Sequence, residues 1–143
     1  MRIRKGSVVS GLAGLFVVIG LPLAGHLARR NAEAGCDLDG VKIDRRYRVE
    51  IVDNQQERHT FCCLRCAQLW MQHQSTAPRS ITVIDEESGE PVDAAAAYYV
   101  RSFVVTQQST GNRIHVFRDR AAAERHAEKH WGTVLPESEN PFR

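Results

Sequence analysis

The sequence predicts an α+β fold of two small strand–helix units, each an antiparallel hairpin followed by a helix, behind an N-terminal membrane helix. Three observations predict this organisation. Short segments rich in Val, Ile, Tyr and Phe are separated by turn residues, which is typical of antiparallel strands. A helix-type segment follows the strands in each half of the chain. A long uncharged run precedes both halves.

The N-terminal residues have the pattern of a membrane anchor or signal segment. Arg2, Arg4 and Lys5 precede the uncharged residues 6–25, and about 20 apolar residues span a bilayer as a helix. The basic end favours a cytoplasmic N-terminus. We therefore expect residues 1–30 to cross the inner membrane once, with the soluble domain in the periplasm. Cleavage of the segment as a signal, or its lipidation, stays an open alternative.

The charge balance argues against nucleic acid as a partner. The formal net charge is +2, but residues 1–35 hold five basic side chains and one acidic one. The remainder is therefore net negative and offers no basic face for phosphates. Its length allows one domain with a modest core.

The first unit is predicted over residues 47–85. Residues 47–52 alternate between apolar and polar side chains, which predicts a half-buried strand. A hairpin loop and a returning strand over 57–61 follow. A helix is then expected over 62–73 and a further strand over 81–85.

The second unit has the same order of elements. Tyr, Phe and Val favour a strand over 98–105, and a short strand follows over 113–117. Asp119 is suited to cap a helix over 120–130. The order strand, strand, helix therefore occurs in both halves of the chain, as a weak internal repeat.

The end of the second helix sets the domain boundary. Ala123 and Ala127 are expected to form its packing stripe, and Gly132 to stop it. The residues that follow are rich in Glu, Ser, Asn and Pro. We expect the domain to cover 36–135 and a loose tail to cover 136–143.

The cysteines predict a soft-metal site. Cys62, Cys63 and Cys66 lie where a strand leads into a helix, and a helix N-terminus favours the thiolate that binds metal. The fourth cysteine, Cys36, lies three residues before Asp39 in a predicted turn. If Asp39 is counted as a ligand, the site has two short-spaced pairs, Cys36 with Asp39 and Cys62 with Cys66, as in treble-clef-like zinc sites. Such ligands suit copper(I) or zinc better than calcium or magnesium.

Two other uses of the cysteines stay open. An even number of cysteines outside the cytoplasm is compatible with disulfides, and a bridge from Cys36 to one of the other three is feasible. Bridges among the other three are poorly placed. Buried, chemically inert thiols are the second alternative.

Histidines supply one further candidate. His115 alternates with apolar residues on a predicted strand and could face the thiols. His59 enters the cluster on a strand, whereas His126 and His130 are more typical of a solvated helix face. The predicted metal ligands are Cys36, Asp39, Cys62, Cys63, Cys66 and His115.

Several segments of the domain resemble one known family. The second half contains Ala97-Tyr98-Tyr99-Val100, His115-Val116-Phe117, an alanine-rich helix and His130-Trp131-Gly132, and the first half has Phe61-Cys62 at a helix start. Over roughly residues 36–135 this pattern resembles the nitrous-oxide-reductase accessory lipoprotein (NosL) family. The resemblance implies an exported, membrane-held metallochaperone rather than an enzyme. It also implies copper(I) as the bound metal, with zinc as the alternative, and a recipient metalloenzyme or assembly protein as the partner.

The chain departs from that family in its first turn. The family's usual Cys-x-x-Cys-Gly-Met is here Cys36-Asp37-Leu38-Asp39-Gly40-Val41, so a carboxylate replaces a thiol. This hard ligand favours zinc and leaves a structural zinc or thiol interaction domain as the alternative function. The pair Cys36 and Asp39 also resembles that of the organomercurial lyases, to which the family is akin. The lyases' second cysteine, before the alanine-rich helix, has no counterpart here. A lyase-like enzyme, the less favoured alternative function, would need Cys62, Cys63 or Cys66 in its place.

Overall fold

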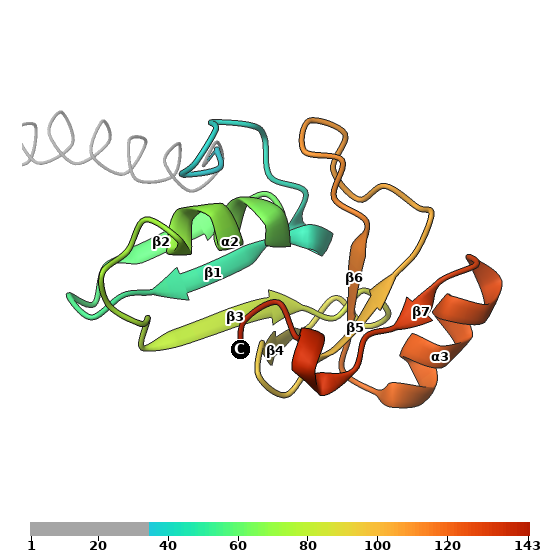
Figure 1. The fold of residues 1–143 in the computed structure, drawn as a ribbon. Helices are drawn as coiled ribbons and strands as arrows, with labels where there is room; N and C mark the ends of the chain where they lie inside the picture. The colour runs from blue at the N-terminus through green and yellow to red at the C-terminus, as the bar shows by residue number, and fades with distance from the viewer. Residues whose placement is uncertain (1–34) are drawn as a thin grey trace, which may run out of the picture. The chain divides into compact units, whose positions relative to one another are not determined.

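Two antiparallel sheets frame residues 35–143, the part of the chain that the computed structural model describes (Figure 1). The predicted membrane anchor, residues 1–30, lies outside the described residues. Within 35–143, no helix combines the length and apolar character needed to cross a membrane. The α+β class predicted from the sequence is confirmed for this part of the chain.

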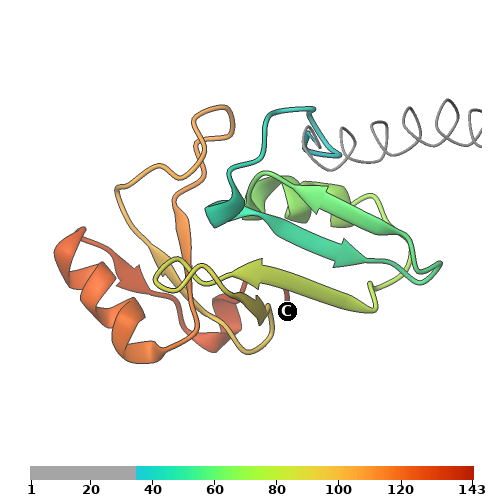
Figure 2. The same ribbon diagram turned by 180° about the vertical axis from the view of Figure 1, so that it is seen from behind.

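The first sheet has the order β2-β1-β3-β4 and carries the main core. Its strands are β1 (Val49–Val52), β2 (Arg58–Phe61), β3 (Ser80–Ile84) and β4 (Pro91–Asp93). Helix α2 (Leu64–Met71) follows β2 and packs on β1 and β2 (Figures 1 and 2). Val49, Ile51, Phe61 and Val83 alternate along the strands and are buried, as the period of two predicts.

The second sheet has the order β6-β5-β7. Its strands are β5 (Tyr98–Arg101), β6 (Ile114–Phe117) and β7 (Thr133–Val134). Helix α3 (Arg120–Lys129) packs against all three strands, and Ala122, Ala123 and Ala127 are its buried residues. The predicted alanine stripe is therefore present.

The two units share one topology. In each, a hairpin is followed by a helix and then by a strand that pairs with the first strand of the hairpin. This shared arrangement explains the weak internal repeat in the sequence. Strands β4 and β7 and two short 3-10 helices, η1 (Arg45–Tyr47) and η2 (Glu137–Glu139), were not predicted.

The boundaries of two strands differ from the predicted ones because side chains near the strand ends bind backbone N–H groups. The strand expected from 47 starts at Val49, because the Asp44 carboxylate accepts the Arg46 N–H at 2.9 Å and forms η1. The strand expected over 98–105 ends at Arg101. Beyond it, the Ser102 hydroxyl accepts the Val104 N–H at 3.1 Å and turns the chain away.

The loose tail expected from residue 136 is wrong. Phe142 packs on the main core, with its ring centroid 6.3 Å from that of Tyr99. Gln68 on α2 donates to the Pro141 carbonyl at 3.1 Å. Apolar burial and this bond fix the C-terminal residues to the first unit.

The predicted helix stop at Gly132 also has a different basis. Trp131, not the glycine, takes the left-handed conformation with a φ of 53°. The Gly132 N–H then donates to the Ala127 carbonyl at 2.8 Å, closing a Schellman-type end. A Cβ on Gly132 would lie 2.7 Å from the Arg101 carbonyl oxygen, so close approach explains the glycine.

Candidate metal centre

The turn at residues 36–41 is built by its own backbone. The Cys36 N–H donates to the Val41 carbonyl at 2.9 Å, and the Gly40 N–H donates to the Cys36 carbonyl at 2.8 Å. Gly40 has a φ of +71°, a left-handed conformation that glycine adopts without a steric cost. The Val41 N–H also donates to Asp39 Oδ1 at 3.1 Å, which holds that carboxylate against the turn.

Asp37 fastens this turn to the first sheet. Strand β2 is an edge strand, so Thr60 has one side free of ladder bonds. The Asp37 N–H donates to the Thr60 carbonyl at 2.9 Å, and the Thr60 N–H donates to Asp37 Oδ2 at 2.6 Å. The sequence analysis missed this role. The signal it offered was an aspartate in a turn, next to the predicted ligand and able to reach an unpaired strand edge.

The other thiols enter from the junction of β2 and α2. Cys62 follows the strand directly, and Cys66 lies one helical turn further on, so their Sγ atoms are 3.5 Å apart. Both side chains are buried. The helix begins at Leu64 rather than at residue 62, because Cys63 is extended and occupies the N-cap position.

The turn and the junction meet at one point. The ligand atoms of Cys36, Asp39, Cys62 and Cys66 all lie within 4.8 Å of one another. The Cys66 thiol is 3.5 Å from Asp39 Oδ2. All four cysteines are free thiols in the structure, so the feasible Cys36 bridge is not formed. We call Cys36, Asp39, Cys62 and Cys66 the thiol cluster.

Burial controls the charge of the thiol cluster. It raises the pKa of Cys62 to about 12 and also raises the pKa of Cys66, with the neighbouring thiols adding to the effect. This rise outweighs the lowering of the thiol pKa that the sequence led us to expect from the helix N-terminus. Burial also acts to raise the pKa of Asp39, but hydrogen bonds from Cys36, the Val41 N–H and Cys66 hold it below its usual value. Without metal, Cys62 and Cys66 are therefore neutral thiols beside the Asp39 carboxylate, and a bound cation replaces their protons.

Cys63 lies beside the thiol cluster rather than within it. Its Sγ is 3.9 Å from that of Cys62 and 3.3 Å from the hydroxyl of Thr110. Thr110 belongs to the loop between β5 and β6, which reaches across from the second unit (Figure 1). This loop therefore covers one side of the site.

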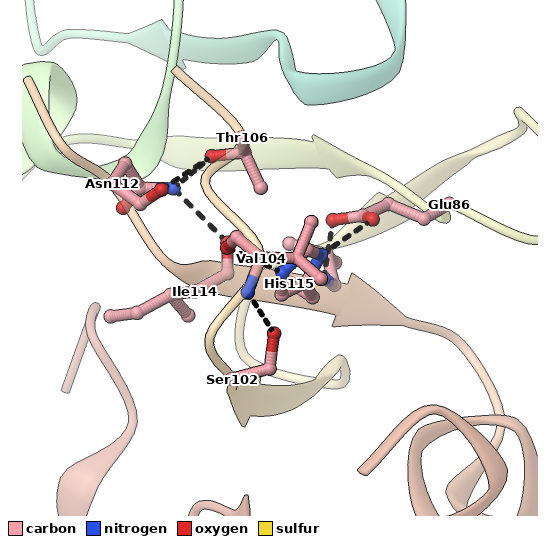
Figure 3. A network of polar contacts seen from close by, with 8 residues as sticks. Glu86, Ser102, Val104, Thr106, Asn112, Ile114 and His115 are labelled. Atoms are coloured by element: carbon pink, nitrogen blue, oxygen red, sulfur yellow. Dashed lines mark hydrogen bonds and ion pairs between the residues drawn. The ribbon is translucent and has the colours of Figure 1, made fainter. Parts of the chain in front are cut away.

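His115 does not join the thiols. Its Nδ1 is 2.8 Å from Glu86 Oε2 and its Nε2 is 3.2 Å from the Val104 carbonyl, so both ring nitrogens are engaged within the protein (Figure 3). The side chain is 1% exposed. The same close-up shows Asn112 bonded to Thr106 and to the Ile114 carbonyl, which braces the covering loop.

The remaining histidine candidates lie in other contacts. His59 Nε2 is 3.1 Å from Asp53 Oδ2, and its ring lies over Trp70 at 4.4 Å between centroids. His126 stacks between His115 and His130, at 4.2 and 4.5 Å. Burial, together with the nearby His115, His130 and Lys129, lowers the pKa of His126 to about 4. None of the three is in the thiol cluster.

Comparisons with known proteins show the fold. Neither a protein-family profile nor a curated protein sequence matches the chain. The structure is similar to that of the copper chaperone NosL from Shewanella denitrificans, with a TM-score of 0.60 and 20% sequence identity. The match covers 74% of this chain and 88% of that chain. The chain therefore has a NosL-like fold. These comparisons give no support to a kinship with organomercurial lyases.

Proposed function

We propose that this protein is a metallochaperone that binds copper(I) at the thiol cluster and passes it to a recipient protein. The observation that supports this most strongly is the meeting of three cysteines from two distant segments at one carboxylate. Thiolates are the protein ligands that select copper(I). The structural neighbour NosL is a copper chaperone, which agrees with this choice.

The distances suit a metal ion. A metal–sulfur bond of about 2.3 Å places neighbouring sulfurs roughly 3.8–4.0 Å apart in trigonal or tetrahedral geometry. The Cys62 and Cys66 sulfurs are 3.5 Å apart, and no pair of ligand atoms in the thiol cluster exceeds 4.8 Å. Binding therefore needs shifts of side chains, not of the fold. The ligands are Cys36, Cys62 and Cys66, with Asp39 at the exposed edge.

The location completes the proposal. Residues 1–30 hold the domain at the periplasmic face of the inner membrane, and the recipient is a periplasmic metalloenzyme or its assembly protein. The uncharged run 6–25 behind a basic N-terminus supports this placement. The proposal contains no catalytic step.

Competitive titration of the reduced full-length protein tests the metal and its ligands. We expect one copper(I) per chain, and we expect Cys36→Ser, Cys62→Ser and Cys66→Ser each to weaken binding by at least about tenfold. Cys63→Ser is the matched control, because Cys63 lies beside the thiol cluster, and it should bind almost as the wild type does. Equal binding by Cys36→Ser and the wild type would refute the proposal. Stoichiometric zinc that copper(I) fails to displace would favour a structural zinc domain instead.

A further inference from the structure

We propose that the metal is handed over at Asp39: a soft donor of the recipient binds copper(I) on the Asp39 side while the three cysteines still hold it. This inference rests on the proposed function and adds the route of transfer and the chemistry of the recipient. Its basis is that three buried thiols and one exposed carboxylate converge on one point.

Exposure distinguishes Asp39 from the thiols. Cys36, Cys62 and Cys66 are 3%, 1% and 0% exposed, and they are enclosed by the turn, β2 and α2. Residues 37–40 are all exposed. The loop from the second unit covers the flank at Cys63 through Thr110. Within residues 35–143, the side of the site that carries Asp39 is therefore the one that an incoming donor reaches without displacing core residues.

Ligand chemistry makes the same residue the easiest to displace. A carboxylate is a hard ligand and copper(I) is a soft ion, so the bond to Asp39 is weaker than the bonds to sulfur. A displaced thiolate would be left as a buried anion, which is costly. A displaced Asp39 returns to water and keeps the hydrogen bond from the Val41 N–H to Oδ1. Oδ2, which is 3.5 Å from the Cys66 thiol, is the oxygen that faces the metal.

The exchange balances without any redox change. A thiol or thioether sulfur of the recipient forms a bond to copper(I) as the bond from Asp39 Oδ2 breaks. The three cysteine thiolates then leave one at a time, and each takes up a proton from water or from an incoming thiol. The ion stays copper(I) throughout.

The surface beside Asp39 describes the recipient's contact. Leu38 is 40% exposed next to the leaving ligand, so it offers an apolar contact. The recipient is therefore expected to present a sulfur donor beside an apolar side chain.

Transfer kinetics test this route. The full-length protein is loaded with one copper(I), and release to bathocuproine disulfonate is followed by the absorbance of the chelate. We expect the wild-type rate to rise in proportion to chelator concentration, because the chelator enters at the Asp39 position. Asp39→Cys should transfer at least about tenfold more slowly, since a soft thiolate replaces a hard ligand. Its rate should depend little on chelator concentration.

Three further measurements decide the outcome. X-ray absorption of Asp39→Cys should count one more sulfur on copper than the wild type. Asp39→Ala should release copper at least as fast as the wild type. Asp44→Cys, which adds a thiol at an exposed aspartate outside the thiol cluster, should change neither rate nor sulfur count. Equal rates for Asp39→Cys and wild type, or an unchanged sulfur count, would overturn the inference while leaving the proposed function standing. Absence of tight copper(I) binding by the wild type would instead remove the proposed function.

Discussion

Asp37→Ala tests whether copper affinity depends on how the first turn is fastened. Asp37 is not a member of the thiol cluster, and its carboxylate accepts the Thr60 N–H at 2.6 Å. A hydrogen bond to a charged group contributes about 1.5–3 kcal/mol, and exposure of the aspartate places this one toward the lower end. Cys36 is the adjacent residue, so loosening the turn raises the cost of bringing its sulfur to the metal. We expect copper(I) affinity to fall by roughly tenfold, the equivalent of 1.4 kcal/mol.

The control separates affinity from stability. Asp44 makes a similar bond, accepting the Arg46 N–H at 2.9 Å, but this bond caps η1 and does not involve the turn at residues 36–41. Asp44→Ala should lower the free energy of unfolding by about 1 kcal/mol and leave copper affinity unchanged. Competition titration gives the affinity, and urea unfolding gives the stability. If Asp37→Ala binds copper(I) as tightly as Asp44→Ala does, the turn needs no fastening and the reasoning fails.

Three more predictions concern charge, an excluded ligand and the C-terminus. The pKa of Cys62 is about 12 in the fold, against 9.0 for an ordinary thiol, so the metal-free protein loses stability as the pH rises from 9 toward 12. Chemical unfolding at pH 8 and pH 10.5 should show this loss for the metal-free protein and not for the protein with copper(I) bound. His115→Ala should destabilise the fold by about 3 kcal/mol, since it leaves Glu86 Oε2 without its partner while Oε1 keeps the bond from the Val116 N–H. Copper affinity should be unaffected, and a tenfold loss of affinity would make His115 a ligand after all. Phe142→Ala should lower the free energy of unfolding by about 2 kcal/mol because the half-buried ring packs on the main core, and an unchanged urea midpoint would contradict that.

Local sequence pattern was enough to predict both helices and the strands β1, β2, β3, β5 and β6, but not the short elements β4, β7, η1 and η2. The chemistry of the cysteines and Asp39 was enough to suggest the thiol cluster. The alternation in β1 and the alanines of α3 each follow from a period set by one element. The turn at Cys36 and the junction at Cys62 were suggested to meet because soft ligands at two ends are typical of one site. The structure brings them together through Asp37 and Thr60.

What the sequence analysis missed depends on partners far along the chain. His115 alternates with apolar residues as a ligand could, but its ring meets Glu86, 29 positions earlier. Phe142 belongs to a polar-looking tail, and only the presence of Tyr99 opposite makes it a core residue. Gly132 follows a helix and suggests a cap. The crowding that requires a glycine there comes from the Arg101 carbonyl on β5.

The shared topology of the two units shows why only one of them carries the thiol cluster. In the first, β2 ends at the buried Phe61, and two residues lead into α2. In the second, β6 ends at the buried Phe117, and again two residues lead into α3. The backbone course is the same, so the side chains at the two intervening positions decide the chemistry.

In the first junction those positions hold Cys62, which belongs to the thiol cluster with Cys36, and Cys63, which contacts Thr110. In the second they hold Arg118 and Asp119. The Arg118 N–H donates to Asp85 Oδ1 at 3.1 Å, and its guanidinium donates to the Pro91 carbonyl at 2.9 Å. This junction therefore joins the second unit to the end of β3 and the start of β4. One junction thus contacts the first sheet and the other supplies thiols, so the side chains, rather than the fold, determine the chemistry available at each junction.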